Sequence, residues 1–256
     1  MGLFHKKTKR PNAIAFVDYE YWFYSYDEHF NGLRPDIEKW SESIHQQYDV
    51  RDIMVFGDFT PLKIKNEPVS IRRVTNTIIE TLNDNGFRTK DMTDFILLDY
   101  IYQIAAERPE IDTFILFTGD GHFHSVVKYL VQKLKKNVII YGITGSFSRN
   151  LVSAATEHIE LPTYDEYLAP ICELIYRNFE YVDEKKMEFV TFSTTISTIS
   201  KFYKVPEEPV RLALEHLCKT GELKVIPRPG VDGRDINTLQ ANWTEINKVR
   251  NYQKVL

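Results

Sequence analysis

The chain has 256 residues, of which 43% are hydrophobic and 13% aromatic, which is enough for one large domain or two small domains with packed cores. Its net charge of −4 is unevenly divided: 12 Lys and Arg stand against eight Asp and Glu from Lys185 to Leu256, whereas residues 1–184 carry a net charge of −8. This asymmetry predicts two modules with different partners, and a positive excess of this size is only a weak indication of nucleic-acid binding.

The opening residues MGLFHKKTKR are basic but contain no apolar core of a secretory signal, so we interpret residues 1–12 as a solvated basic tail. No segment approaches the roughly 20 apolar residues that a membrane span requires. Cys172 and Cys218 are far apart and lie in apolar helical patterns, as is typical of buried thiols in a reducing compartment. These features predict a cytoplasmic protein with no membrane partner.

Up to residue 112 the hydrophobic pattern predicts alternating strands and helices. An apolar strand at 13–17 ends in Asp18, and the aromatic run from Tyr19 to Tyr26 is interpreted mainly as core packing, with a few rings available to stack on unpaired bases. The other predicted elements are a helix at 36–48, a strand at 52–57 followed by Asp58, a polar loop at 61–69, a helix at 74–85, a short edge strand at 87–90 and a helix at 94–105.

Residues 113–142 predict a strand–turn–helix–strand unit. Strands at 114–117 and 138–141 flank a sharp turn at 118–121 and an amphipathic helix at 123–134. Such a connection makes the strands parallel and covers the sheet on both faces, so functional groups are expected at the carboxyl ends of the strands. A helix within 146–155 and an edge strand at 159–162 follow.

Four aspartates fall at strand ends or helix starts of this sheet: Asp18, Asp58, Asp94 and Asp120. For any one of them, helix capping, worth about 1 kcal/mol, or a favourable place in a helix's first turn is a sufficient explanation. Together they would repel one another without a cation, and two or three carboxylates suffice for Mg²⁺ or Mn²⁺, which can activate water and brace phosphate oxygens. Asp99 interrupts an apolar helical surface that we expect to be buried, where a carboxylate needs a metal or a basic partner.

Four motifs in the same order resemble the NYN domain, a member of the PIN-like nuclease superfamily: FVDYEY at 16–21, VFGDF at 55–59, KDMTDFILLD at 90–99 and FTGDGHF at 117–123. The resemblance runs from 13 to 162, and we expect a PIN-like three-layer α/β domain at 13–165. It implies a Mg²⁺- or Mn²⁺-dependent endoribonuclease acting on single-stranded or structured RNA. By this resemblance the metal ligands are Asp18, Asp94 and Asp120, and the residues expected around them are Asp58, Asp99 and Lys90.

The chain departs from the family pattern at several positions. His122 replaces the second aspartate of the fourth motif, Tyr21 replaces an asparagine after the first strand, and Thr156 occupies a position that is often aspartate. The interval from Asp94 to Asp99 is also one residue shorter than expected. We include His122 among the catalytic residues, as a ligand, a phosphate contact or a proton shuttle, while a plain helix-start role is the alternative. Loss of a carboxylate predicts weaker metal affinity.

The remaining chain predicts a connecting helix at 166–184, centred on 170–179, and a small winged-helix-like α+β domain at 185–256. Its expected elements are a strand or approach segment at 188–193, helices at 195–203 and 207–220, the second begun at Pro206 and stopped at Gly221, and strands at 222–226 and 238–241 around a polar tip at 227–235. The candidate nucleic-acid contacts are Arg211, Lys224, Arg228 and Arg234.

Three functions are compatible with the sequence. The first is a metal-dependent ribonuclease whose second domain binds nucleic acid or a partner. The second is a weakly active or inactive RNA-binding or regulatory protein, and the third is a winged-helix transcription regulator that binds DNA. A homodimer is a further candidate assembly, whereas the lack of a Walker-type P-loop disfavours a nucleoside triphosphatase.

Overall fold

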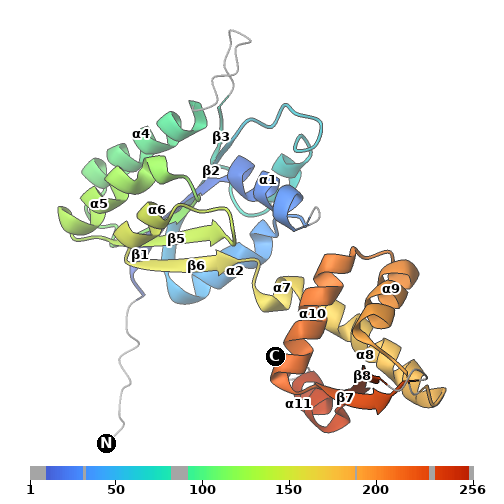
Figure 1. Cartoon of the computed structure of the whole chain (residues 1–256). Coiled ribbons are helices and arrows are strands. Elements are labelled where there is room, and N and C mark those ends of the chain that lie inside the picture. Colours follow the sequence, from blue (N-terminus) through green and yellow to red (C-terminus); the bar gives the residue numbers. More distant parts are fainter. Residues whose placement is uncertain (1–9, 31–32, 82–91, 188, 231–233, 254–256) are drawn as a thin grey trace, which may run out of the picture. The chain divides into compact units, whose positions relative to one another are not determined.

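The computed structural model describes residues 10–30, 33–81, 92–187, 189–230 and 234–253. The chain divides into two compact units, Met1–Leu161 and Pro162–Leu256 (Figure 1). Lys90 and the edge strand predicted at 87–90 lie outside the described residues. In the described part of the chain, no helix combines the length and the apolar character needed to cross a membrane.

The first unit is built on a six-stranded sheet with the order β3-β2-β1-β4-β5-β6, in which all neighbouring strands are parallel. The chain moves outward from β1 to β3 and then returns to the other side of β1 for β4, so the strand order reverses between β1 and β4. Ligands of open parallel sheets bind at the carboxyl ends of the strands at such a reversal. The strands are β1 (Asn12–Asp18), β2 (Asp49–Gly57), β3 (Ile78–Glu80), β4 (Thr113–Phe117), β5 (Asn137–Ile143) and β6 (Glu157–Leu161).

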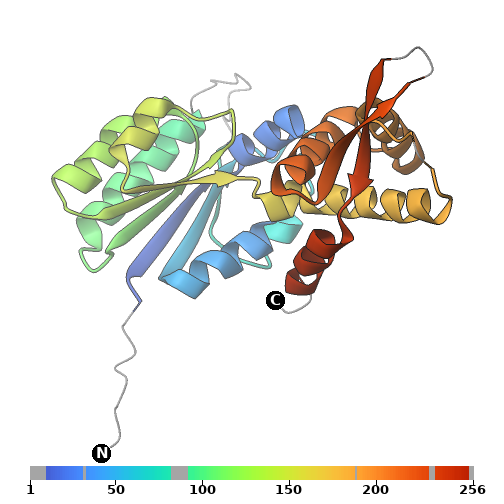
Figure 2. The ribbon, with the colours of Figure 1, turned by 60° about the horizontal axis from the view of Figure 1, so that its bottom comes forward.

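Helices cover both faces of the sheet, because successive strand residues point to opposite sides. Ala13, Ala15 and Val17 of β1 join the core on one face, whereas Ile14 and Phe16 join the core on the other. The first core is covered by α1 (Tyr19–His29), α2 (Ile37–Gln47) and α3 (Glu67–Ile71), and the second by α4 (Met92–Glu107), α5 (His124–Gln132) and α6 (Arg149–Ala154) (Figure 2). The predicted three-layer α/β architecture is therefore confirmed.

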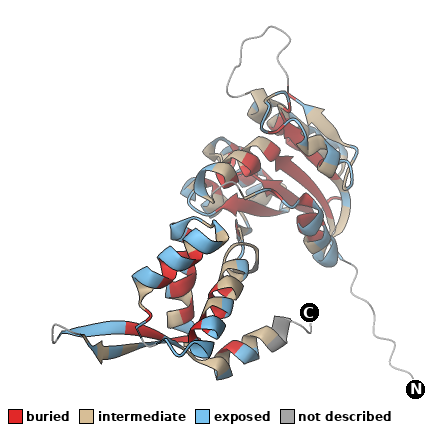
Figure 3. Ribbon diagram, turned by 90° about the vertical axis from the view of Figure 1, so that its right-hand side faces the viewer, coloured by how far each residue is buried: buried red, intermediate tan, exposed pale blue. Residues whose placement is uncertain are grey.

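Helix α1 carries much of the aromatic packing of the first core. Trp22 stacks on Phe117 with a centroid distance of 4.0 Å, and its ring meets the ring of Trp40 edge to face at 5.9 Å. Tyr19 and Phe23 of the same helix are also fully buried. The interpretation of this aromatic run as core packing is correct for these residues, which are not available to stack on bases (Figure 3).

The helix predicted at 74–85 is wrong. In this region the chain forms α3 earlier, within the predicted polar loop, and then the short strand β3. Val55 and Phe56 of β2 pair with Ile78 and Ile79 of β3, and the backbone of Val55 also donates a hydrogen bond to the Thr77 carbonyl group at 3.0 Å. A run rich in β-branched residues is well suited to this edge of the sheet, and strand pairing outweighs the helical spacing of the apolar residues.

Among its described residues, the second unit packs five helices and a hairpin around its own core. Helix α8 contributes Cys172, Ile175, Tyr176, Phe179 and Val182 to that core, so the helix predicted as a connector is part of this unit. Helix α10 ends at Gly221, whose φ of +87° is readily adopted by glycine. The elements are α7 (Tyr164–Tyr167), α8 (Ala169–Glu184), α9 (Phe192–Tyr203), α10 (Glu207–Thr220), β7 (Leu223–Pro229), β8 (Asp235–Ala241) and α11 (Trp243–Gln253).

Two features of this unit differ from the prediction. Residues 189–191 do not form a strand; Val190 accepts one hydrogen bond from Leu239 of β8 at 2.6 Å, and Thr191 then caps α9. Helix α11 was not predicted, because its apolar residues are sparse and, within 243–250, where burial is described, Ile246 alone is buried. Two helices joined at Lys204 and followed by an antiparallel hairpin are consistent with the predicted winged-helix-like unit.

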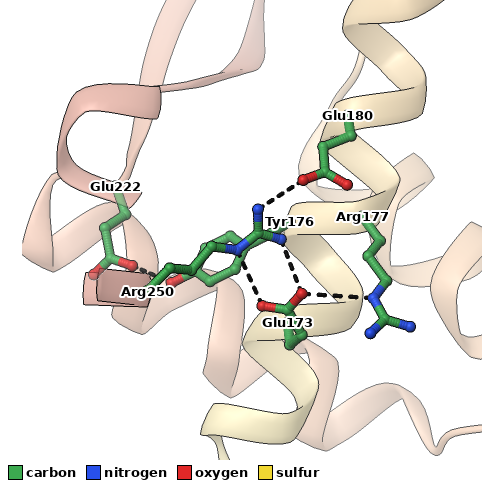
Figure 4. Close-up of polar contacts among 6 residues, drawn as sticks. All are labelled: Glu173, Tyr176, Arg177, Glu180, Glu222 and Arg250. Atoms are coloured by element: carbon green, nitrogen blue, oxygen red, sulfur yellow. Dashed lines mark hydrogen bonds and ion pairs between the residues drawn. The ribbon is translucent and has the colours of Figure 1, made fainter. Parts of the chain in front are cut away.

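Helix α11 is joined to α8 by a polar network centred on Arg250 (Figure 4). The guanidinium group of Arg250 donates to both carboxylate oxygens of Glu173, at 3.1 and 2.9 Å, and to Glu180 at 2.6 Å. It also lies over the ring of Tyr176, 5.0 Å from the centroid. On the inner side, the Tyr176 hydroxyl donates to Glu222, which is buried and also accepts from Thr220 at 2.8 Å.

Tyr176→Phe tests the inner part of this network. It removes a donor from the buried Glu222 carboxylate, so we expect the free energy of unfolding of the second unit to fall by about 2 kcal/mol. Chemical denaturation of the full chain measures the change. Tyr181→Phe is the matched control, because Tyr181 lies on the same helix and is 53% exposed. Equal effects of the two substitutions would contradict the assigned role of the buried pair.

Candidate metal centre

Asp18 occupies the carboxyl end of β1, next to the strand-order reversal. Its Oδ1 accepts a hydrogen bond from the Tyr21 N–H at 3.0 Å and thereby caps α1, while only 7% of the residue is exposed. The pKa of the Asp18 carboxyl is raised to about 8, chiefly by burial. The hydrogen bond from Tyr21 lowers this pKa, whereas the charges of Asp94, Glu20 and Asp120 raise it. Asp18 is therefore both a helix cap and a member of an acidic group.

Asp120 occupies the equivalent position after β4. It caps the short 3₁₀ helix η1 (Gly121–Phe123), since its Oδ1 accepts from the His122 N–H at 2.8 Å. Its own N–H donates to the Thr118 hydroxyl at 3.3 Å, and Thr118 is buried at the end of the strand. Phe123 anchors the other end of η1 in the core. The backbone on both sides of Asp120 is therefore held in place.

Asp94 enters the site from the first turn of α4, where the helix dipole favours negative charge. The Nδ1 atom of His122 lies 3.8 Å from Asp94 Oδ2 and 3.4 Å from Asp120 Oδ1. Asp94, Asp120 and His122 each offer one potential ligand atom, and these three atoms lie within 4.8 Å of one another. Two carboxylates and an imidazole thus converge from helix α4 and from the turn after β4, and Asp18 is close enough to interact electrostatically with both carboxylates.

The sequence interpretation missed Glu20. Its Oε2 accepts hydrogen bonds from the Asp58 N–H at 3.0 Å and from the Thr93 hydroxyl at 3.2 Å. Thr93 in turn bonds the hydroxyl of Thr81, just after β3, at 2.7 Å. Glu20 therefore links α1 to the end of β2 and to α4, beside the acidic group. The sequence could have pointed to Glu20, because this residue stands two positions after Asp18, in the first turn of α1.

The two other acids that were predicted around the metal ligands, Asp58 and Asp99, both accept local hydrogen bonds. The Oδ1 atom of Asp58 accepts from the N–H and the hydroxyl of Thr60, at 2.9 and 2.5 Å, and closes a tight turn after β2. Asp99 is exposed and accepts from Gln103 at 2.7 Å one helical turn further on. The expectation that Asp99 is buried and needs a metal or a basic partner is therefore wrong: the apolar surface that it interrupts is on the outside of α4.

Two of the positions that depart from the family pattern, Tyr21 and Thr156, make hydrogen bonds to the backbone of β5. The Tyr21 hydroxyl accepts from the Ile143 N–H at 2.8 Å, and burial raises the pKa of Tyr21 to about 12. Thr156 accepts from the Val138 N–H at 3.1 Å, at the amino end of β5. A carboxylate at that position would lie at the opposite edge of the sheet from Asp120, so Thr156 does not remove a ligand from this site.

The four predicted nucleic-acid contacts lie on the hairpin and on helix α10 of the second unit. Lys224 and Arg228 are four residues apart on β7 and therefore share one face of the hairpin. Arg234 is exposed beside the start of β8. Arg211 lies on α10, paired with Glu208 at 3.4 Å, and it lines a small pocket together with Phe192, Ser193, Ile196 and Glu207.

Gly119→Ala tests the packing beneath the site. A β-carbon at position 119 would overlap the Ser146 carbonyl oxygen and the Tyr21 hydroxyl, and would lie 2.6 Å from Tyr21 Cζ. We expect the free energy of unfolding of the first unit to fall by about 2 kcal/mol or more, since a backbone oxygen cannot move aside as a flexible side chain can. Gly121→Ala is the control, because its β-carbon would meet only the Ser148 side chain, at 3.0 Å. A loss of stability in Gly119→Ala no larger than that in Gly121→Ala would contradict the close contact of Gly119 with Ser146 and Tyr21.

Asp18→Asn tests the raised pKa. Between the unfolded value near 4 and the folded value of about 8, the folded chain holds a proton that the unfolded chain has released, so stability falls as pH rises. Asparagine keeps the oxygen that caps α1 but does not ionise. In the presence of a chelator we expect the variant to be more stable than the wild type above pH 8, with the difference shrinking toward pH 4. Denaturation curves across this pH range measure the difference in stability. A difference that does not change with pH would contradict the raised pKa of Asp18.

Comparison with known proteins agrees with this geometry. The NYN domain model matches residues 12–162. A crystal structure of a protein of unknown function from Vibrio parahaemolyticus aligns with a TM-score of 0.53 and 22% sequence identity, covering 61% of this chain and 96% of the other, a likeness that shows the fold alone. None of the curated proteins matches the chain. With the matched segment spanning the whole parallel sheet and the acidic group at its carboxyl edge, the chain belongs to the NYN domain family.

Proposed function

We propose that the protein is a metal-dependent endoribonuclease that hydrolyses RNA phosphodiester bonds at the group formed by Asp18, Asp94, Asp120 and His122. The observation that carries the proposal is the convergence of Asp94, Asp120 and His122 ligand atoms within 4.8 Å at the carboxyl edge of an NYN sheet. Membership of a nuclease superfamily supports the reaction class, and the acidic group supports a divalent cation.

The donor set fits Mg²⁺ or Mn²⁺. Asp94 and Asp120 offer carboxylate oxygens, Asp18 adds a third carboxylate nearby, and His122 offers a ring nitrogen. A bound divalent cation would supply charge neutralisation for the phosphate and a more acidic water. The raised pKa of Asp18 indicates that three carboxylates in this space are not fully ionised at neutral pH without added positive charge. Cation binding is therefore expected to release a proton from Asp18 and to strengthen as pH rises.

The protein's own residues would orient the reacting groups. Asp120 is fixed by its bonds to the His122 N–H and the Thr118 hydroxyl, so its carboxylate is held in one position as substrate enters. Glu20 ties α1, the end of β2 and α4 together, next in sequence to the segments that carry Asp18 and Asp94. The imidazole of His122 is 67% exposed and faces solvent at the entrance, where it can meet an incoming phosphate.

The second unit is proposed to bind RNA or a protein partner. Its hairpin presents Lys224 and Arg228 on one face, with Arg234 beside them, and the predicted net charge of residues 185–256 is positive. Contacts between such cations and the phosphate backbone of RNA would add affinity without sequence specificity. DNA binding through this unit and a homodimer are further candidates, and sequence-selective binding to duplex DNA would instead favour a transcription regulator.

Asp120→Asn tests the ribonuclease. With labelled RNA and Mg²⁺ or Mn²⁺, we expect the wild type to cleave and the variant to lose at least 100-fold in rate, because the substitution removes one charged ligand without changing its size. Glu107→Gln is the control, an exposed carboxyl group at the far end of α4. RNA binding without cleavage by the wild type would overturn the proposal and leave an RNA-binding protein.

A further inference from the structure

The imidazole of His122 faces the two carboxylates that the proposed function assigns to the cation. Its Nδ1 atom is 3.4 Å from Asp120 Oδ1 and 3.8 Å from Asp94 Oδ2. Both distances exceed those of ordinary N–H···O hydrogen bonds, which are about 2.7–3.2 Å. The ring is thus near both carboxylates without being closely bonded to either.

These separations suit a shared cation. Adjacent ligands of an octahedral ion with ligand distances of about 2.1 Å lie about 3 Å apart, so small side-chain movements would bring the three atoms into one coordination sphere. The backbone at His122 is fixed by the 2.8 Å bond from its N–H to Asp120 and by the burial of Phe123. A short, capped turn therefore presents the imidazole to the carboxylates.

We propose that His122 ligates the cation through Nδ1 and makes the site select Mn²⁺ over Mg²⁺. This inference rests on the proposed function only in taking the acidic group as the metal site. Mg²⁺ prefers oxygen ligands, whereas affinity for an imidazole nitrogen rises from Mn²⁺ along the first-row divalent metals. The aspartate that stands at this position in the family pattern would supply a third anionic oxygen. Replacing it by a neutral nitrogen donor weakens Mg²⁺ binding more than Mn²⁺ binding.

The test compares the full-length wild type with His122→Asp. Calorimetric titrations with Mn²⁺ and with Mg²⁺ give the ratio of the two affinities, and we expect this ratio to fall at least tenfold in the variant. Pulsed electron paramagnetic resonance of bound Mn²⁺ is expected to detect coupling to an imidazole nitrogen in the wild type and to lose it in His122→Asp. His122 is 67% exposed, so the substitution is not expected to unfold the chain.

His124→Asn is the matched control, because His124 begins α5 two residues later and lies outside the group of converging ligand atoms. It should retain both the nitrogen coupling and the affinity ratio. Mn²⁺ bound by the wild type without nitrogen coupling would overturn the role of His122 and leave the ribonuclease proposal standing. Failure of Mn²⁺ and Mg²⁺ to bind either the wild type or His122→Asp would overturn the metal site itself, and the proposed function with it.

Discussion

The first unit depends on keeping several negative charges close together. Asp18 and Asp120 follow adjacent parallel strands, and Asp94 comes from a helix that covers one face of the sheet. Their mutual repulsion, added to burial, is recorded in the pKa of Asp18, which is raised to about 8. A fold that only had to be stable would not benefit from this arrangement, since uncompensated carboxylates destabilise the folded chain as pH rises. A bound cation would remove this repulsion, so stability and the proposed metal binding would be coupled at the same residues.

The surroundings of the acidic group are rigid. Capping bonds from the backbone hold Asp18 and Asp120, and Glu20 connects three elements behind them. Tyr21 lies against Gly119 and accepts a bond from β5, where the family pattern has an asparagine. The Tyr21 side chain therefore connects α1 with the turn after β4 and with β5. The two departures nearest to the site thus differ in consequence: Tyr21 supports the structure, whereas His122 changes the donor set.

The second unit is stabilised by a different kind of interaction. Its core holds a buried carboxylate, Glu222, that accepts from Tyr176, and its last helix is attached through Arg250 to two glutamates of α8. Removing one member of a buried pair is costly, because the other is left without its partner. Pairing of this kind leaves little free charge on Arg250 itself.

The sequence by itself determined the parallel α/β architecture, the strands at the centre of the sheet and the placing of Asp18, Asp94 and Asp120 at its carboxyl edge. These features follow from periodicity, turn residues and motif order, which are local properties of the chain. It did not determine strand β3 or the exposure of Asp99, because both depend on which residues pack against them. Nor did it reveal Glu20 or the small separation between His122 and the two carboxylates. Those were decided by the tertiary structure, since only folding brings Glu20 within hydrogen-bonding distance of Thr93, 73 residues further along the chain, and places His122 beside Asp94.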